Sequence, residues 1–237
     1  SLNAFDQVGA PTTWVLSNHD VVRHVSRFGL QSHDLRSGDG IGPEDAQPDH
    51  VLGLARARAA TLLMLALPGG VYLYQGEELG LPDHTMIPHT FRQDPTFHRT
   101  DGERVGRDGS RVPLPWRADE PSYGFSSHGK SWLPQLGLWG THARDIQQRN
   151  PDSTLRMYQD ALRLRRELDL GHGSLAWLPE YNQGGVVAFA NGSVLAAMNL
   201  GSEPVELPGF EILQESSPGA MEHTRLRPNR TVWMSIP

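Results

Sequence analysis

The chain has 237 residues, with 21 Lys and Arg against 27 Asp and Glu and a formal net charge of −6 at pH 7. This acidic balance, without a basic stripe, argues against nucleic acid as the partner, and no apolar run reaches the ~18 residues that a membrane span needs. Cysteine is absent, which excludes disulfides, thiol catalysis and cysteine-based metal sites.

Two short apolar runs, each followed by polar residues, predict two strands of a parallel sheet. Residues 13–16 (TWVL) lead into residues 18–20 (NHD), and residues 71–74 (VYLY) lead into residues 75–78 (QGEE). We expect the first strand to be buried and each strand to have a polar cluster at its carboxyl end. A polar loop and a helix lie between them, so the segment is predicted to form a βαβ unit.

Two helices are predicted from apolar periodicity and end signals. The first covers residues 51–67, with Asp49 suited to its N-cap and residues 68–70 (PGG) ending it. The second begins after residues 151–153 (PDS), carries apolar residues along one side, and has Gly171 near its C-terminal end.

Residues 80–150 show no strong periodicity, and seven prolines interrupt them. An ordered irregular stretch of this length is usually functional. Its tryptophans, Trp116, Trp132 and Trp139, could form a platform for a sugar, although packing of the loop is the expected role of at least two of them.

After Gly173 the pattern changes to short strands separated by Gly, Asn and Pro turns. We predict these strands at residues 174–178, 186–190, 194–199, 205–207, 211–213 and 232–236. The last part of the chain is therefore expected to be a small antiparallel β module.

The polar ends of the two parallel strands form the first candidate site, because ligands bind at that edge of α/β sheets and barrels. Capped turns explain the same residues equally well. A third cluster, residues 106–111 (GRDGSR), carries two arginines and an aspartate that could hold sugar hydroxyls or a carboxylate, or could pair with one another. No HExxH spacing, G-x-S-x-G elbow or P-loop is present, so no metal site and no cofactor is expected.

Three motifs, in order along the chain, resemble the α-amylase superfamily of glycoside hydrolases (family 13). The region of its seventh barrel strand is similar to residues 9–11 (GAP), 14–23 (WVLSNHDVVR) and 26–29 (SRFG). Its eighth strand is similar to residues 67–70 (LPGG) and 74–80 (YQGEELG). The loop that marks its α-glucosidase and oligo-1,6-glucosidase branch is similar to residues 106–116 (GRDGSRVPLPW). The resemblance implies an α/β fold. Residues 1–172 would be the last two βα units of a TIM (β/α)8 barrel, strands seven and eight with the long loop and final helix, and residues 173–237 a small antiparallel β-sandwich domain.

The resemblance also implies roles for single residues. Asp20 matches the carboxylate that holds sugar hydroxyls and stabilises an oxocarbenium-like transition state, without acting as nucleophile or proton donor. His19 and Arg107 match residues that contact the same sugar. Further substrate-binding candidates are Arg111 as a second arginine, and Arg23, Gln75 and Glu77 in the pocket wall.

Retaining glycosidases need two more carboxylates, about 5–5.5 Å apart, and in this family they follow the fourth and fifth strands. Only 18 residues precede His19, and Glu77, Glu78 and Asp108 are not expected to replace them. We therefore expect the C-terminal part of a retaining α-glucosidase, catalytically incomplete when alone. The parent reaction would hydrolyse or transfer α-linked glucose from the non-reducing end of maltose-like or isomaltose-like oligosaccharides.

The expected partners are this small α-glucoside or oligosaccharide substrate and an upstream N-terminal barrel portion, without nucleic acid or membrane, in the cytoplasm. Two strands of an eight-stranded barrel have open edges, so the isolated chain is expected to be poorly stable or to associate. The alternative hypothesis is a non-catalytic sugar-binding or interaction module of the same family.

Overall fold

The computed structural model describes residue 5, residues 8–31 and residues 39–237. The chain forms two compact units, each built from separate segments. The first unit contains the N-terminal residues up to Val15, Arg58–Tyr72 and Met157–Pro237, and the second contains Leu16–Ala57 and Leu73–Arg156. The expected boundary between residues 172 and 173 stays a prediction.

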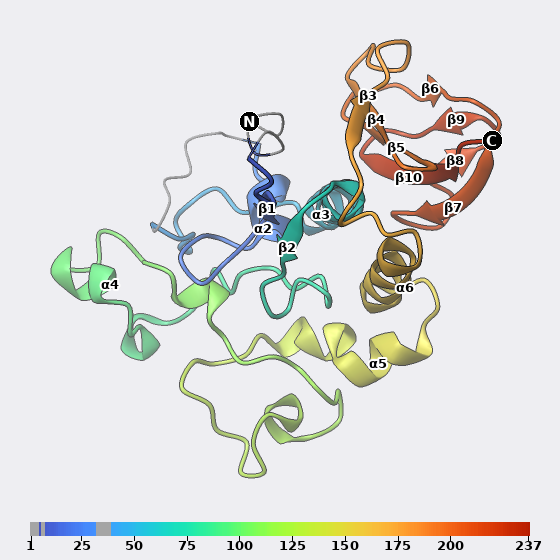
Figure 1. The fold of residues 1–237 in the computed structure, drawn as a ribbon. Helices are drawn as coiled ribbons and strands as arrows, with labels where there is room; N and C mark the ends of the chain where they lie inside the picture. Colours follow the sequence, from blue (N-terminus) through green and yellow to red (C-terminus); the bar gives the residue numbers. More distant parts are fainter. Residues whose placement is uncertain (1–4, 6–7, 32–38) are drawn as a thin grey trace. The chain divides into compact units, whose positions relative to one another are not determined.

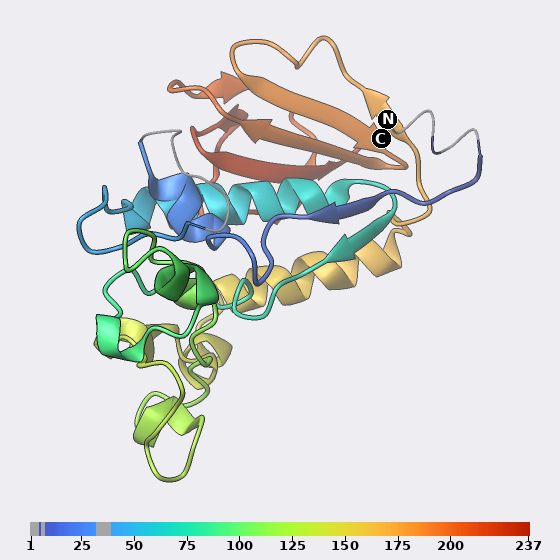
Figure 2. The same ribbon diagram turned by 90° about the vertical axis from the view of Figure 1, so that its left-hand side faces the viewer.

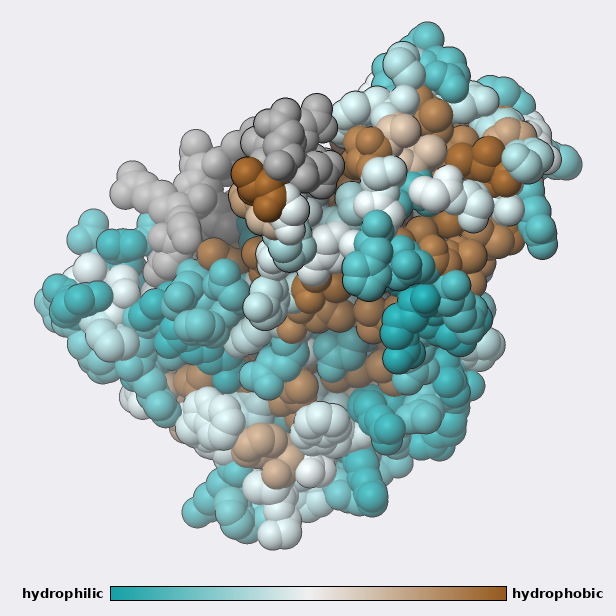
Figure 3. Space-filling model, in the orientation of Figure 1, coloured by the Kyte–Doolittle hydropathy of each residue, from teal (hydrophilic) through white to brown (hydrophobic). Residues whose placement is uncertain are grey.

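The first unit contains the predicted pair of parallel strands, β1 (Thr13–Val15) and β2 (Gly70–Tyr72) (Figure 1). In the described part of the chain they form a sheet of two strands only. The expectation that β1 is buried is wrong, because Val15 is 51% exposed, and Tyr72 of β2 is 69% exposed. Figure 3 shows hydrophobic surface near β2. Apolar strand residues remain at the surface here because, among the described residues, no third strand pairs with β1 or β2.

Helix α3 (His50–Ala66) forms where the sequence predicts it. The Asp49 side chain accepts hydrogen bonds from the backbone N–H groups of Val51 and Leu52, both at 2.9 Å, so the predicted N-cap is confirmed. Gly69 then turns the chain with φ +97°, and a Cβ there would lie 2.3 Å from the Thr12 carbonyl oxygen. Glycine at this position lets the chain reverse from α3 into β2.

Helix α6 (Thr154–Glu167) is the second predicted helix. Its Arg165 is buried and donates to the backbone carbonyls of Leu65, Leu67 and Gly69. The guanidinium of Arg165 thus connects α6 to the end of α3 and to the turn that leads into β2. After the helix, Asp169 rather than Gly171 takes the left-handed conformation, with φ 52°.

The rest of the first unit forms two antiparallel sheets. The larger has the order β3-β4-β5-β10-β7 and the smaller the order β6-β9-β8. Their bounds are β3 (Leu175–Trp177), β4 (Val186–Asn191), β5 (Val194–Asn199), β6 (Val205–Glu206), β7 (Glu211–Glu215), β8 (Met221–Glu222), β9 (Arg225–Leu226) and β10 (Arg230–Ser235). The antiparallel module is confirmed, and β8 and β9 are additional to the predicted strands.

Alternation along the central strands gives the five-stranded sheet two apolar faces. One face, with Phe189, Ala196 and Trp233, packs against the buried leucines of α3, and Figure 2 shows these orange and red strands lying along that helix. The opposite face, with Ala197 and Val232, packs in a second cluster that includes residues of the smaller sheet. The central strands β4, β5 and β10 are therefore buried on both sides.

The second unit is mostly irregular but has its own core. Leu79, Leu81, Val112, Leu133 and Trp139 are buried together in one apolar cluster. Short helices interrupt the loops: α2 (His24–Gly29), α4 (Pro95–Arg99) and α5 (Arg144–Arg149), with 3-10 turns at His89–Phe91, Asp108–Ser110, Pro121–Gly124 and Gly137–His142. In neither unit does a helix of the described residues have the length and apolar character to cross a membrane.

Candidate functional site

Asp20 is the centre of a polar cluster in the second unit. Its Oδ1 accepts from Arg107 Nη1 at 2.6 Å and from Arg111 Nη2 at 3.2 Å, and its Oδ2 lies 3.4 Å from His19 Nε2. The Asp20 side chain is 51% exposed. Four residues predicted from the sequence are thus brought together around one accessible carboxylate.

The turn that carries Asp20 has a local explanation as well. The Asn18 side-chain oxygen accepts from the backbone N–H of Asp20 at 2.8 Å, which is the hydrogen bond of an Asx turn. Arg111 Nε also donates to the His19 carbonyl at 2.9 Å. The capped turn and the candidate site therefore coexist, since the cap leaves the Asp20 carboxylate free to meet the arginines.

Arg107 and Arg111 flank a single 3-10 turn, Asp108–Ser110, and so lie four positions apart in the chain. Behind them lies Asp94, whose side chain is fully buried. Its Oδ2 accepts from the backbone N–H of Arg107 at 3.0 Å and from Arg107 Nε at 2.7 Å. The same oxygen lies 3.6 Å from Arg111 Nη1.

Asp94 was not predicted as a site residue. It begins α4, where its Oδ1 accepts from the Thr96 backbone N–H at 2.8 Å and Pro95 occupies the first turn. An Asp-Pro pair is a helix-start signal. That signal indicates the local helix but says nothing of a partner 13 residues further along the chain.

The charges of Asp94 and Arg107 are stable over the ordinary pH range. Burial alone would raise the pKa of Asp94, but hydrogen bonds from Arg107 and Thr96 outweigh it and hold that pKa well below its usual range. The hydrogen bond with Asp94 in turn raises the pKa of Arg107. Asp94 is therefore an anion and Arg107 a cation at neutral pH.

Arg23 lies inside the second unit and is only 1% exposed. Its guanidinium donates to the carbonyls of Gln75 and Ser110, each at 2.8 Å, and stacks over the Tyr74 ring at 4.9 Å. The backbone N–H of Arg23 donates to Asp83 Oδ1 at 2.9 Å. Arg23 thus ties the segment after β1 to the segment after β2 and to the turn that carries the arginines.

Glu77 is buried as well, with its Oε1 3.7 Å from His24 Nδ1. Burial raises the pKa of Glu77 to about 7. Burial, with the nearby cations Arg27 and Arg23, lowers the pKa of His24 to about 3. Both groups are therefore neutral between these values, and their contact is not an ion pair there. As substrate-binding residues, Glu77 and Arg23 remain predictions.

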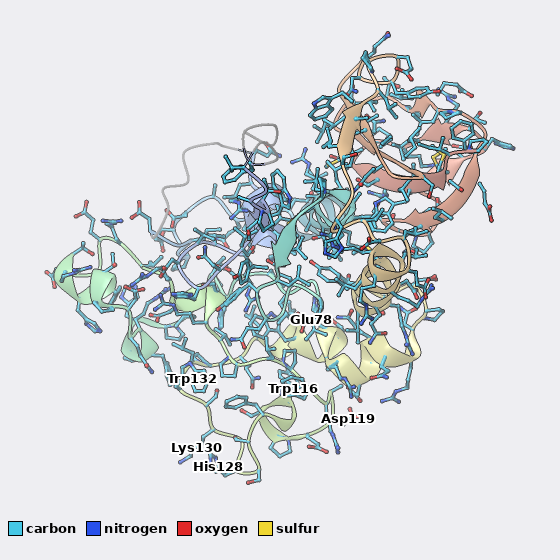
Figure 4. All side chains as sticks on the ribbon, viewed as in Figure 1. Glu78, Trp116, Asp119, His128, Lys130 and Trp132 are labelled. Atoms are coloured by element: carbon cyan, nitrogen blue, oxygen red, sulfur yellow. The ribbon has the colours of Figure 1, made fainter. Side chains whose placement is uncertain are left out.

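The tryptophans of the irregular stretch divide into two kinds. Trp139 is fully buried in the core, whereas Trp116 and Trp132 are 44% and 52% exposed. Trp132 nevertheless packs edge-to-face against Phe125, with ring centroids 5.2 Å apart, so a packing role for at least two of the three stays a prediction. Figure 4 shows Trp116 and Trp132 on the loop drawn in green, which also carries Lys130.

Two other acidic residues of the sequence analysis have local structural partners. Glu78, also shown in Figure 4, accepts from the Gly76 backbone N–H at 2.8 Å. Asp108 is buried, and its Oδ2 accepts from the backbone N–H groups of Gln93 and Asp94 at 2.8 and 3.1 Å. Among the residues that the structure describes, no group of three or more His, Asp or Glu side chains is arranged to hold a metal ion.

This geometry suits the recognition of a polyhydroxylated ligand. A carboxylate accepts hydrogen bonds from hydroxyl groups, while arginine N–H groups donate to hydroxyl oxygens. Because each arginine has five donors in a fixed plane, Arg107 and Arg111 can hold Asp20 and still donate to a ligand. The accessible carboxylate is also placed to stabilise positive charge that develops nearby.

Comparison with known proteins points in the same direction. A probable α-glucosidase of Rhizobium meliloti is 35% identical over 153 residues, covering 65% of this chain and 24% of the relative. The oligo-1,6-glucosidase IMA5 of Saccharomyces cerevisiae is 29% identical over 178 residues, covering 66% of this chain and 28% of the relative. The crystal structure of the α-glucosyl transfer enzyme XgtA superposes with a TM-score of 0.71 at 31% identity, covering 99% of this chain and 43% of that one.

The chain thus spans about a quarter of the length of these curated relatives and less than half of the solved enzyme. The family model of the α-amylase catalytic domain matches residues 3–172, which is more than half of the chain. Together with the Asp20 cluster and the parallel strand pair, this match shows that the chain belongs to the α-amylase family of glycoside hydrolases.

Proposed function

We propose that this chain is the C-terminal part of a retaining α-glucosidase that hydrolyses or transfers α-linked glucose from the non-reducing end of short oligosaccharides. The observation that carries the proposal is the contact of the exposed Asp20 carboxylate with Arg107, Arg111 and His19 in a chain with an α-glucosidase relative at 35% identity.

Asp20 is assigned the binding of sugar hydroxyls and the stabilisation of the transition state. Cleavage of a glycosidic bond passes through an oxocarbenium-like transition state with positive charge on the sugar ring. A fixed carboxylate close to that ring stabilises the developing charge. Arg107, Arg111 and His19 hold this carboxylate in place and supply donors to the ring oxygens.

The nucleophile and the general acid are assigned to an N-terminal barrel portion. In this proposal β1 and β2 are strands seven and eight of a TIM barrel, and residues 173–237 are the C-terminal β domain. The exposed Val15 and Tyr72 side chains support it, since barrel strands normally pack their apolar residues against neighbouring elements. The barrel portion that completes the sheet is thus the proposed protein partner.

The test combines this chain with a separately produced N-terminal barrel portion of the Rhizobium meliloti relative, here named the reconstituted enzyme. Hydrolysis of p-nitrophenyl α-glucoside by the mixture, but by neither part alone, is the expected result. Asp20→Asn should then lower kcat by about a hundredfold or more. Asp119→Asn, at an exposed position of the irregular stretch, is the matched control and should leave the rate unchanged.

A complex that forms without α-glucosidase activity would contradict the proposal, and so would an active complex that tolerates Asp20→Asn.

The second candidate is a non-catalytic sugar-binding module. It is favoured by the fact that Asp20, His19 and both arginines all lie in the second unit. Binding of glucose to this chain alone, measured by calorimetry and unchanged by the barrel portion, would support that alternative.

A further inference from the structure

Asp94 is the buried residue on which the arginines of the Asp20 cluster converge. Its Oδ2 accepts two hydrogen bonds from Arg107, at 2.7 and 3.0 Å, and faces Arg111 Nη1 at 3.6 Å. Charge-assisted hydrogen bonds of this kind are the stronger class in proteins. A fully buried carboxylate thus lies behind the two cations, and the half-exposed Asp20 in front of them.

The planar guanidinium of Arg107 connects the two carboxylates. Its Nε donates to Asp94, and its Nη1 donates to Asp20 at 2.6 Å. Because the donors of an arginine lie in one rigid plane, fixing Nε and the backbone N–H on Asp94 also fixes the direction in which Nη1 points. The geometry of Asp94 therefore sets the geometry of the contact with Asp20.

Asp94 is itself held on several sides. It caps α4 through Thr96, and its own backbone N–H donates to Asp108. Gly106, at φ +72°, passes so close that a Cβ there would lie 2.7 Å from the Asp94 Cβ. The carboxylate is thus a fixed point, whereas a lone arginine at the surface has many rotamers.

The positive charges of Arg107 and Arg111 are balanced only when Asp94 is counted together with Asp20. Without Asp94, the Asp20 carboxylate would be the sole anion facing both arginines, and both would bind it strongly. Asp94 takes a share of that positive charge, which leaves Asp20 with free acceptor capacity for a ligand hydroxyl.

We propose that Asp94 is a positioning residue, which orients Arg107 and Arg111 so that they hold Asp20 in its working geometry. The inference rests on the proposed glucosidase function for its consequence in catalysis. The contact between Asp94 and Arg107 can be tested without that function.

The first experiment uses the full chain and the proton and nitrogen resonances of the Arg107 Nε–H group, assigned by its loss in Arg107→Lys. In the wild type this proton should exchange slowly with water. In Asp94→Asn its exchange should be faster by about tenfold or more, the effect of losing a charge-assisted hydrogen bond. An unchanged exchange rate would overturn the inference, even if no glucosidase activity is ever found.

The second experiment uses the reconstituted enzyme. Asp94→Asn should lower kcat/KM by about tenfold or more. When combined with Arg107→Lys, it should cause little further loss, because both changes break one connection. Losses that multiply in the double variant would mean that Asp94 does not act through Arg107.

A third variant separates positioning from folding. Asp94→Ser keeps a side-chain oxygen suited to capping α4 but removes the carboxylate from the arginines. We expect it to fold, to lose the slow Arg107 Nε–H exchange and to lose activity as Asp94→Asn does. Full activity of Asp94→Ser would show that capping is the only role of the residue. Asp145→Asn, on α5 and paired with Arg149, is the control that should leave both readouts unchanged.

Discussion

Arg107 and Asp20 are 87 positions apart in the chain, yet Nη1 of the arginine lies 2.6 Å from Oδ1 of the aspartate. The contact connects the segment after β1 with the loop that follows β2. In the proposed enzyme, that loop completes the sugar-binding site rather than only covering it.

Replacement of Arg107 by lysine tests whether the planar guanidinium matters. A lysine has a single charged nitrogen, which cannot contact both Asp94 and Asp20 in the same geometry. We expect Arg107→Lys to lower kcat/KM of the reconstituted enzyme by about 10- to 100-fold. Arg117→Lys, where the arginine is exposed and pairs with Glu120, is the matched control. A value within twofold of wild type for both variants would contradict the role of Arg107.

Arg23 is expected to stabilise the second unit. Arg23→Met removes the donors to the Gln75 and Ser110 carbonyls and leaves Asp83 with only one of its two nearby cations, Arg27. We expect a loss of about 3 kcal/mol in the free energy of unfolding, measured in urea. Adding Asp83→Asn should recover part of it, because the buried carboxyl that has lost one of its two nearby cations is then replaced by a neutral amide. A loss below about 0.5 kcal/mol in the single variant would disagree with this interpretation.

Glu77 predicts a specific pH dependence of stability. Its pKa is raised from 4.5 to about 7 by burial, so the unfolded chain releases the proton at lower pH than the folded chain. Below about pH 4.5 Glu77 is protonated in both the folded and the unfolded chain, so it costs no free energy of unfolding. As pH rises from there through 7, the unfolded chain loses the proton first, and the free energy of unfolding falls. Glu77→Gln cannot ionise and avoids that loss.

The measurement is the difference in unfolding free energy between Glu77→Gln and wild type, from pH 4.5 to pH 8. It should shift in favour of the variant by about 3 kcal/mol, since one pKa unit corresponds to about 1.4 kcal/mol. His24, with its pKa lowered to about 3, lowers the free energy of unfolding as pH falls below 6.5. This contribution is the same in wild type and variant, so it cancels in the difference. A difference that does not vary with pH would show that Glu77 is ionised in the folded chain.

Arg165 offers a stability test in the first unit. Arg165→Met keeps the length of the side chain but leaves the carbonyls of Leu65, Leu67 and Gly69 without their donor. We expect a loss of about 3 kcal/mol in the free energy of unfolding. Arg163→Met, on the same helix but half exposed and paired with Glu167, should change it by less than about 0.5 kcal/mol. Equal effects of the two changes would contradict the stabilising role of the Arg165 hydrogen bonds.

Local signals were sufficient to predict the long elements of the fold. Asp49 indicated where α3 begins, and the turn at residues 68–70 indicated where it ends. Strands β4 and β5 have strong apolar character and a Gly turn between them. By contrast, β8 and β9 have two residues each, and so short a pair is specified by its packing rather than by its own pattern.

The site was predicted in part, for a similar reason. Asp20 and the two arginines belong to recognisable motifs, so their meeting was expected. Asp94 lies in an irregular, proline-interrupted stretch, and its partner is set by how the loop folds back. The exposure of β1 could not be read from its composition, because an apolar strand looks the same with or without neighbours.

The packing of Trp233 on α3 has a consequence for the order in which the chain acquires structure during synthesis. Its indole N–H donates to the Leu62 carbonyl at 3.0 Å across 171 residues of chain, and its ring closes the cluster that covers that helix. A ribosome makes α3 long before β10, so the apolar side of α3 must wait uncovered while the intervening chain is translated. The first unit therefore cannot fold progressively from its N-terminal end, because its core is complete only after β10 has been made.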